Sequence, residues 1–137
     1  MSVVKELIRS EKNGTISFGN YELNEKSKLS DFEHGGDVYK IKTYKDITKL
    51  EKNGSFVYES VPGTAVKDFK ATDNSVSFDV EGNEDAQITL ELEEGSEYAI
   101  EIDGESLGKM ATNMGGKLVV SVEFDGNNEK KVVITKA

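Results

Sequence analysis

The chain has 137 residues, of which 26 are acidic and 17 are basic, so its net charge is −9 at neutral pH. This length accommodates one domain or two very small ones. The negative charge would repel phosphate backbones and anionic lipid surfaces, so we expect no nucleic-acid partner and no membrane partner. Because the chain contains no cysteine, disulfides, thiolate zinc sites and cysteine nucleophiles are excluded.

The hydropathy and the first residues of the chain indicate where it functions. No run of 18 apolar residues is present, so we expect no membrane-spanning helix. The first ten residues, MSVVKELIRS, lack the basic and apolar regions of a secretory signal. Together with the absence of cysteine, this slightly favours a cytoplasmic location.

The N-terminal segment 3–10 can be interpreted as a helix or as a strand. Its apolar residues have helical spacing and Ser2 could cap a helix, whereas its valines and the Asn-Gly pair that follows favour a strand. The motif EKNG occurs twice, at 11–14 and 51–54, each time between segments of β character. Asn-Gly is the strongest short hairpin signal, so we predict a strand at 3–10 and a hairpin at each copy. The N-glycosylation pattern that both copies also match is the weaker interpretation.

The segment DFEHGGD, residues 31–37, contains the only histidine, His34. Catalysis by a Ser-His-Asp arrangement would have to use it, but the chain has no G-x-S-x-G elbow. Three carboxylates here are weak candidates for metal ligands, although their spacing does not match a calcium loop: Asp31, Glu33 and Asp37. The two glycines provide the freedom of a tight turn, so we favour an exposed hairpin turn and expect no metal and no cofactor.

Aromatic side chains on an exposed sheet are good binding anchors. With no tryptophan in the chain, a binding surface of this kind would use tyrosine or phenylalanine. Three tyrosines lie in predicted hairpin strands whose faces the sequence does not assign. We take them as tentative ligand-binding residues: Tyr39, Tyr44 and Tyr58.

From residue 63 onward, apolar and polar residues alternate between turns that recur about every ten residues. Such alternation places one set of side chains on one face of each strand. About seven strands of this kind are typical of an immunoglobulin-like or fibronectin-like sandwich. The side chains expected in its core are Val76, Phe78, Val80, Ala86, Ile88, Leu90, Leu92, Tyr98, Ile100, Ile102, Leu118, Val120, Val122, Phe124, Val132 and Ile134.

The predicted fold class is therefore all-β, with N-terminal β-hairpins packed with a C-terminal immunoglobulin-like or fibronectin-like β-sandwich. The only proline, Pro62, lies between the two parts. We accordingly divide the chain into an N-terminal hairpin region, 1–62, and a sandwich domain, 63–137. One continuous domain is the alternative.

Two further segments look like ligand-binding loops and are better interpreted as turns. TNMGGKL, at 112–118, lacks the first glycine and the final Ser or Thr of a P-loop. DGNNE, at 125–129, has the composition of a calcium loop, but Asp125-Gly126 lies between two β segments and predicts a hairpin turn.

Resemblance to a known family is carried by three stretches: GTISFGNYEL (14–23), DVYKIKTYKDITKLEKNGSFVYESVPGT (37–64) and DAQITLELEEGSEYAIEIDG (85–104). They resemble a family of short acidic all-β proteins from anaerobic Gram-positive bacteria, often automatically labelled endosialidase and of unproven function. Sialidase-type sites hold the sialic acid carboxylate with several arginines, whereas Arg9 is the only arginine here, and lysine lacks the bidentate fork. The resemblance therefore transfers no functional residue and does not imply an enzyme.

These observations favour a non-catalytic binding or assembly module. We expect it to recognise a protein or a carbohydrate, with self-association into a homo-oligomer through the edges of its N-terminal hairpins as a variant. The alternative is a small carbohydrate-active hydrolase with paired carboxylates. It would need a concave site that holds two carboxyl groups, at least one of them with a raised pKa.

Overall fold

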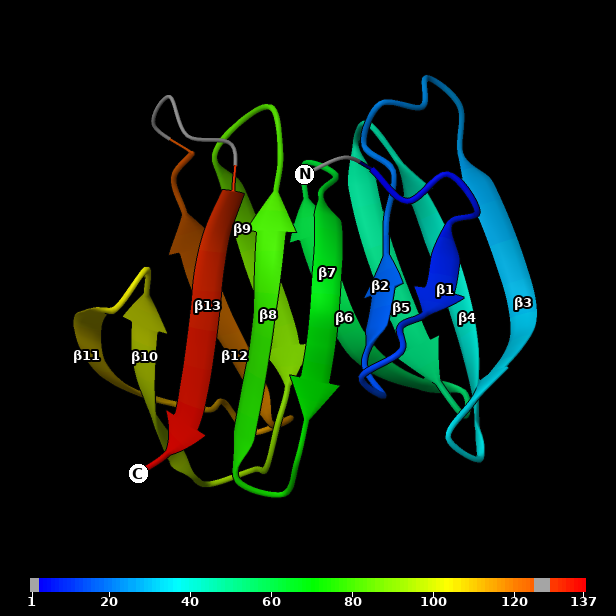
Figure 1. The fold of residues 1–137 in the computed structure, drawn as a ribbon. Helices are drawn as coiled ribbons and strands as arrows, with labels where there is room; N and C mark the ends of the chain where they lie inside the picture. Colours follow the sequence, from blue (N-terminus) through cyan, green and yellow to red (C-terminus); the bar gives the residue numbers. More distant parts are fainter. Residues whose placement is uncertain (1–2, 125–128) are drawn as a thin grey trace.

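The computed structural model describes residues 3–124 and 129–137. Within these residues, thirteen strands form two antiparallel sheets that pack as a sandwich (Figure 1). In spatial order, sheet A contains β1 (Ile8–Ser10), β2 (Ile16–Phe18), β7 (Ala65–Ala71), β8 (Ser75–Glu81), β13 (Glu129–Lys136), β10 (Glu97–Ile102) and β11 (Glu105–Ala111). Sheet B contains β12 (Lys117–Val122), β9 (Ala86–Glu91), β6 (Ser55–Val61), β5 (Ile47–Lys52), β4 (Asp37–Tyr44) and β3 (Ser27–His34). No helix of the described residues is long and apolar enough to cross a membrane.

The predicted fold class, an all-β sandwich, is confirmed. Of the segment 3–10 predicted as a strand, Ile8–Ser10 form β1, which pairs antiparallel with β2, with Ile8 opposite Phe18. Residues 3–7, which include both valines, are not in a strand. In the described part of the chain beyond residue 63, seven strands follow, β7 to β13. Five of them lie in sheet A and two in sheet B, whereas an immunoglobulin constant domain divides its seven strands into four and three.

Strands from both halves of the chain contribute to both sheets. β2 pairs with β7 in sheet A, and β6 pairs with β9 in sheet B. One cluster of buried side chains extends along the chain from Ile8 to Ile134. Pro62 lies between β6 and β7, where the chain crosses from sheet B to sheet A. The predicted boundary between 1–62 and 63–137 therefore coincides with a change of sheet. Strands from the two sides of this boundary pair with one another in both sheets, as in one continuous sandwich.

The core is built from the alternating side chains that the sequence indicated. All of them are buried except Leu92 and Ile102, which pack against the core while partly exposed. Four aromatic rings meet in the core with centroids 5.2 to 6.3 Å apart, mostly edge to face, an arrangement that the ring quadrupoles favour. These rings belong to Phe18, Tyr58, Phe69 and Phe78.

Hydroxyl side chains connect β4 and β5 to the crossover after β6. The Thr48 hydroxyl donates to the Thr64 carbonyl oxygen (2.8 Å) and accepts from the Thr64 backbone N–H (3.1 Å). Because its single proton is used in this way, Thr43 must donate the bond that joins the hydroxyls of Thr43 and Thr48 (2.8 Å). The Thr43 hydroxyl in turn accepts from the backbone N–H of Asn20 (2.9 Å). The donor and the acceptor of each of these hydrogen bonds are thereby fixed.

The same network includes the hydroxyls of Tyr58 and Ser60, which both bond to the hydroxyl of Thr64 at 2.7 Å. All three side chains are fully buried, and burial raises the pKa of the Tyr58 phenol. Among the described residues, no buried side-chain nitrogen or oxygen is without a hydrogen-bond partner. Since an unpaired buried hydroxyl is costly, the network satisfies groups that would otherwise destabilise the core.

The crossover also packs tightly against neighbouring backbone. A Cβ on Gly63 would lie 2.1 Å from the Tyr44 carbonyl oxygen, and one on Gly19 would lie 2.4 Å from the Thr64 carbonyl oxygen. No residue with a side chain fits at such distances, so both positions require glycine. We refer to this end of the sandwich, with residues 61–64 and the buried hydroxyls, as the closed end.

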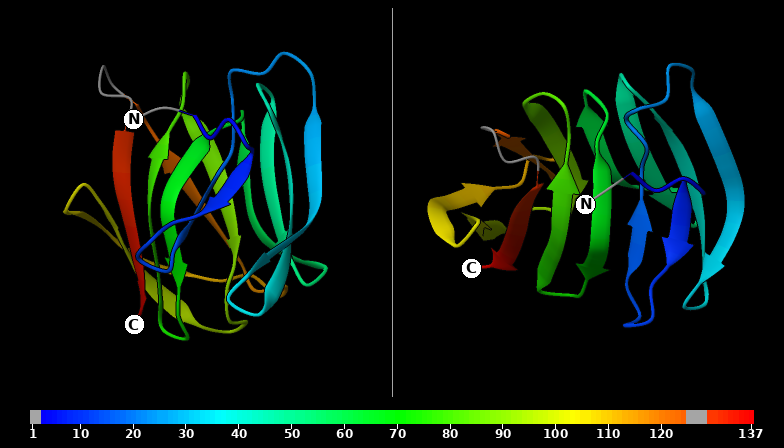
Figure 2. Two further views of the ribbon diagram at one scale, coloured as in Figure 1. Left: turned by 45° about the vertical axis from the view of Figure 1, so that its right-hand side comes forward. Right: turned by 45° about the horizontal axis from the view of Figure 1, so that its top comes forward.

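At the opposite end, which we call the loop end, six connections lie together because consecutive strands alternate in direction (Figures 1 and 2). The Asn-Gly hairpins and the Gly-Gly hairpin of DFEHGGD are confirmed and are three of these six. The turn in TNMGGKL is also confirmed and precedes β12. The hairpin predicted at Asp125-Gly126 lies outside the described residues. The six connections are 11–15, 35–36, 53–54, 72–74, 92–96 and 112–116.

Candidate functional site

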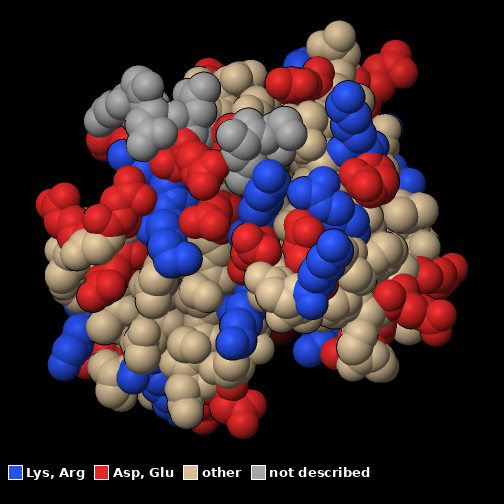
Figure 3. All heavy atoms as spheres, viewed as in Figure 1, with Lys and Arg blue, Asp and Glu red and all other residues tan. Residues whose placement is uncertain are grey.

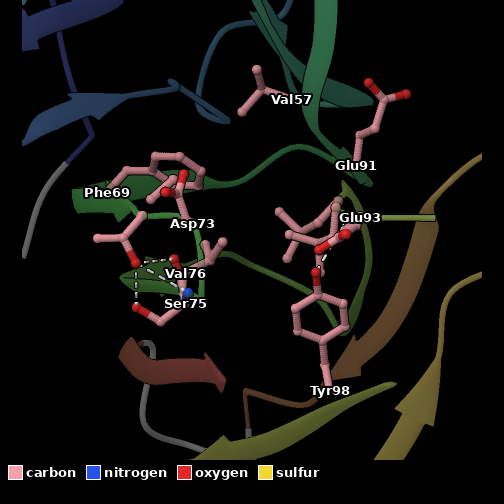
Figure 4. Close-up of a pocket in the computed structure, with 12 residues that line it drawn as sticks. Val57, Phe69, Asp73, Ser75, Val76, Glu91, Glu93 and Tyr98 are labelled. Atoms are coloured by element: carbon pink, nitrogen blue, oxygen red, sulfur yellow. Dashed lines mark hydrogen bonds between the residues drawn. The ribbon is translucent and has the colours of Figure 1, made fainter. Parts of the chain in front are cut away.

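A narrow slot of about 160 Å³ opens between the two sheets at the loop end. In Figure 4, side chains of β7, β8 and their turn face side chains of β9 and β10 across this slot. Tyr98 is held in place because its hydroxyl accepts a hydrogen bond from the backbone N–H of Glu93 (3.1 Å). Carboxylates of Asp73, Glu91 and Glu93 lie among the polar lining. The apolar lining comes mainly from Val57, Phe69, Val76, Leu90, Leu92 and Tyr98.

A wider groove of about 440 Å³ adjoins the slot and extends to the β3–β4 hairpin. The two hollows share four lining residues: Val57, Phe69, Ala71 and Glu91. The remaining polar lining of the groove carries both signs of charge and comes from His34, Asp37, Lys52 and Lys70, with Tyr39 and Ile16 as further apolar surface. We refer to the slot and the groove together as the loop-end cleft.

His34 connects the edges of the two sheets where the groove ends. Its Nε2 lies 3.0 Å from the carbonyl oxygen of Gly14, and its Nδ1 lies 2.7 Å from the hydroxyl of Ser10. A carbonyl only accepts, so Nε2 carries a proton and donates it. In the neutral ring, Nδ1 then accepts from Ser10. The hairpin position predicted for His34 is confirmed, but the ring is partly buried and bonded to the β1–β2 hairpin rather than exposed in solvent.

Asp37 is fixed at the groove by the second Asn-Gly hairpin. Its carboxylate accepts from the Asn53 side-chain amide (2.9 Å) and lies 3.4 Å from the Lys52 ammonium. The hydrogen bond from Asn53 is the main cause that lowers the pKa of Asp37, and the positive charge of Lys52 adds to it. The side-chain oxygen of Asn53, Oδ1, also accepts from the backbone N–H of Val38 (2.9 Å). Asn53 therefore holds an ionised carboxylate in one orientation.

The three tentative ligand-binding tyrosines do not form one surface. Tyr39 lines the groove from the inner face of β4, where partial burial raises its pKa. Tyr44 lies at the end of the same strand, and the ammonium of Lys26 lies 5.9 Å from its ring centroid. Tyr58 is fully buried in the core. The aromatic platform of three exposed tyrosines is therefore a wrong prediction, because side chains of these strands alternate between faces and only Tyr39 of the three lines the cleft.

The weak metal candidates are also separated. Asp31 and Glu33 are exposed, and Asp31 lies in a bulge of β3 with a φ of 62°. Asp37 is engaged by Asn53 and Lys52. Within residues 3–124 and 129–137, no three His, Cys, Asp or Glu side chains are grouped so that they could hold a metal ion.

Two carboxylates, Asp37 and Glu91, line the groove. A glycosidase needs one carboxyl group that stays protonated and acts as the acid. The surroundings of Asp37 favour its ionised form, and Glu91 pairs with the ammonium of Lys117 at 2.8 Å. Glu81, whose pKa burial raises, lies at the closed end beside Tyr21. The groove therefore holds two carboxylates that are each paired with a lysine, beside apolar surface.

Comparisons of this chain with models of protein families, with curated proteins and with solved structures find no match. The cleft is interpreted from its own geometry.

Sequence reasoning missed most of the cleft. Val57 and Phe69 have the pattern of core residues, and only the strand pairing shows that they also line an opening between the sheets. Lys52 and Lys70 are ordinary strand lysines in the sequence. The available signal was the chemistry of the turns, since each Asn-Gly or Gly-Gly pair either contains a residue of the groove, as at Gly14 and Gly35, or directly follows one, as after Lys52.

Proposed function

We propose that this protein is a non-catalytic binding module that takes a segment of a partner protein into the loop-end cleft. The observation that carries this proposal is the junction of a small apolar slot with a wider, charged groove. A slot of about 160 Å³ suits one apolar side chain, and the groove offers hydrogen-bonding groups to the chain on either side of it. Binding pockets commonly combine apolar walls with a few fixed polar groups in this way.

The energetics support an apolar anchor. Full burial of one side chain such as Leu or Phe contributes about 1.5–3 kcal/mol, enough for one residue to dominate a small interface. The charged groups of the groove then select the flanking residues. Asp37 and Lys52 are held by contacts within the protein, so little conformational entropy is lost when they bind a ligand.

A carbohydrate is the second candidate ligand, and Tyr39 favours it. Its ring lines the groove together with Asp37 and Lys52, which combines an apolar face with charged hydrogen-bonding partners for sugar hydroxyls. The alternative of a small hydrolase would use the carboxylates of Asp37 and Glu91, which line the same groove.

Three finer expectations remain proposals. Binding by loops gathered at one end of a sandwich is the mode that immunoglobulin-like domains use, and the loop-end cleft agrees with that comparison. The resemblance to short acidic bacterial proteins adds no residue to the cleft. Self-association through the N-terminal hairpins would use β1, an edge strand of sheet A, or β3, an edge strand of sheet B. The bulge at Asp31 interrupts the regular edge of β3 that strand pairing needs.

The proposal is tested by selecting ligands for the whole chain from a displayed library of random peptides and measuring the affinity of the enriched peptide by calorimetry. Ala71 is exposed and lines both hollows, so Ala71→Trp should obstruct the cleft and weaken binding by about tenfold or more. The matched control is Ala99→Trp on β10, where Ala99 lies between the buried Tyr98 and Ile100 and faces away from the core. If both substitutions reduce affinity equally, or no peptide is enriched, the cleft does not bind protein segments.

An array of oligosaccharides distinguishes the second candidate. If a sugar binds, Tyr39→Ala should abolish the signal, whereas Tyr44→Ala should retain it, because Tyr44 is on the same strand but does not line the cleft. Release of reducing sugar from a bound oligosaccharide, lost in Asp37→Asn, would instead identify a hydrolase.

A further inference from the structure

The outer face of sheet B carries a row of lysines whose position is set by the strand register. Lys28 on β3 lies directly opposite Lys42 on β4, and Lys42 lies directly opposite Lys49 on β5. Neighbouring strands are about 5 Å apart. Ile41 and Thr43 on either side of Lys42 are buried, so Lys42 points away from the core. Three positive charges therefore lie side by side on three adjacent strands.

Like charges directly opposite each other on adjacent strands are destabilising. The pKa of Lys42 is lowered, first by partial desolvation and then by the positive charges of Lys26, Lys49 and Lys28. The chain has nine more acidic than basic residues, so its composition does not require lysines to lie next to one another. In Figure 3, the face formed by sheet A shows acidic and basic side chains intermingled. The lysine row on sheet B thus differs from the mixed charges of that face.

The lysines also enclose a hollow of about 60 Å³, lined by Lys28, Lys40, Lys42, Lys49 and Glu51. Four of these five side chains are positively charged. Glu51 pairs with Lys49 at 3.6 Å, and Glu59 lies near enough to Lys42 to favour its charged form. These two carboxylates leave a net positive charge around the hollow. Its size suits one small group rather than a length of chain.

We propose that this hollow binds a single oxyanionic group, such as phosphate or sulfate, through Lys28, Lys42 and Lys49. Lysine binds phosphate as a point charge, and its three donors can turn to meet tetrahedral oxygens. An oxyanion among the three ammonium groups replaces their mutual repulsion with attraction. The net negative charge of the remaining surface excludes a nucleic-acid backbone, which requires an extended basic stripe. The site is independent of the loop-end cleft, since the lysine-lined hollow shares no lining residue with the slot or the groove.

The experiment is a titration of the isotope-labelled whole chain with inorganic phosphate at low ionic strength, followed by amide NMR shifts. We expect saturable shifts at β3, β4 and β5 that sodium chloride of equal ionic strength does not produce. Lys42→Met should weaken phosphate binding by about tenfold or more, because it removes the central charged donor of the row. Lys28→Met, on the exposed edge strand, provides a second variant that does not disturb the centre of the sheet.

The matched control is Lys109→Met on β11, which makes the same change of net charge on an exposed strand of sheet A. It should leave phosphate affinity unchanged. A sulfated hexasaccharide titrated in parallel identifies the source of the group: binding of free phosphate indicates a small-ion site, and Lys42-dependent binding of the hexasaccharide alone indicates an oxyanion carried on a polymer. Equal shifts with chloride, or equal losses in the Lys42 and Lys109 variants, would show general screening and overturn the proposal.

Discussion

The two ends of the sandwich use polar residues in opposite ways. At the closed end, the hydroxyls of Thr43 and Thr48 bond to each other, Thr48 also bonds to the backbone of Thr64, and all three residues are fully buried. At the loop end, side chains such as Asp37 and Lys52 bond to each other while still lining an open cleft. The contrast shows that one end buries its polar groups and that the other leaves them facing an open cleft.

The difference between the two ends follows from how closely their connections pack. At the closed end, the crossover at 62–64 from sheet B to sheet A packs so closely against backbone that Gly63 has no room for a Cβ. The loop end contains four hairpin turns within one sheet, at 11–15, 35–36, 53–54 and 72–74, and two connections between the sheets, at 92–96 and 112–116. The cleft opens among these connections. Substitutions at the closed end should therefore change stability, and substitutions at the loop end should change binding.

The largest effect should come from Gly63→Ala. Its Cβ would lie 2.1 Å from a backbone oxygen that cannot move aside without displacing the β4–β5 turn. We expect a loss of about 3 kcal/mol or more in the free energy of unfolding, measured with urea. Gly115→Ala is the control, because its Cβ would meet only the Asn113 side chain at an ordinary 3.6 Å. Equal stability of the two variants would contradict the tight packing described for the crossover.

Thr48→Val should have the next largest effect. Valine has nearly the same shape but cannot bond to the backbone of Thr64 or accept from Thr43. Each buried group left without a partner costs about 1–3 kcal/mol, so we expect a loss of about 2–3 kcal/mol in urea unfolding. Thr89→Val, at a partly exposed position of β9, should change stability little. A cost at position 89 as large as at position 48 would mean that loss of the hydroxyl network is not the cause.

The sequence predicted one end of this comparison better than the other. Hairpins at the Asn-Gly and Gly-Gly pairs follow from local turn chemistry, and the core of β8 to β13 follows from alternation, so both could be predicted. The closed end depends on contacts between residues far apart in the chain, such as Asn20 with Thr43 and Thr48 with Thr64. No local pattern reports such contacts.

The candidate sites were hidden for a related reason. Tyr39 and Tyr44 lie on opposite faces of their strand only if the strand is regular over its whole length, which the sequence does not show. Alternation also does not show which of the two faces points into the core. The lysine row needed the register of two hairpins, because a shift of one residue would move Lys42 to the other face of its strand. The bulge in β3 shifts the β3–β4 pairing, so the position of Lys28 opposite Lys42 could not be counted from the turn alone.

At the loop end, Asn53→Gly tests how much Asn53 contributes to stability and how much it lowers the pKa of Asp37. Asn53 has a φ of 51°, which glycine adopts without strain, so the substitution removes the side-chain bonds to Asp37 and Val38 alone. We expect a loss of about 1 kcal/mol in stability. NMR titration should show the pKa of Asp37 returning towards its usual value, because the Asn53 amide is the main cause that lowers it. An unchanged Asp37 titration would assign that role to Lys52 instead.

The smallest expected effect is the pH dependence of stability, to which the carboxylates Asp37 and Glu81 at the two ends should contribute with opposite sign. The pKa of Asp37 is lowered from 3.8, so its contribution to stability is present above that pH and is lost as the pH falls below it. The pKa of Glu81 is raised from 4.5 by burial. The folded protein then holds this proton more tightly than the unfolded chain, so Glu81 lowers stability as the pH rises through 4.5 and beyond.

Glu81→Gln removes this titration and keeps an oxygen that can accept from the Tyr21 hydroxyl. We therefore expect the variant to gain stability relative to the wild type as the pH rises from 4.5 towards neutrality, in urea unfolding at a series of pH values. Glu84→Gln, exposed in the connection after β8, removes a carboxylate from the same end and should follow the wild type. If the difference between Glu81→Gln and wild type is independent of pH, the buried carboxyl group titrates alike in both states. The contrast between the two ends would then rest on packing and hydrogen bonding alone.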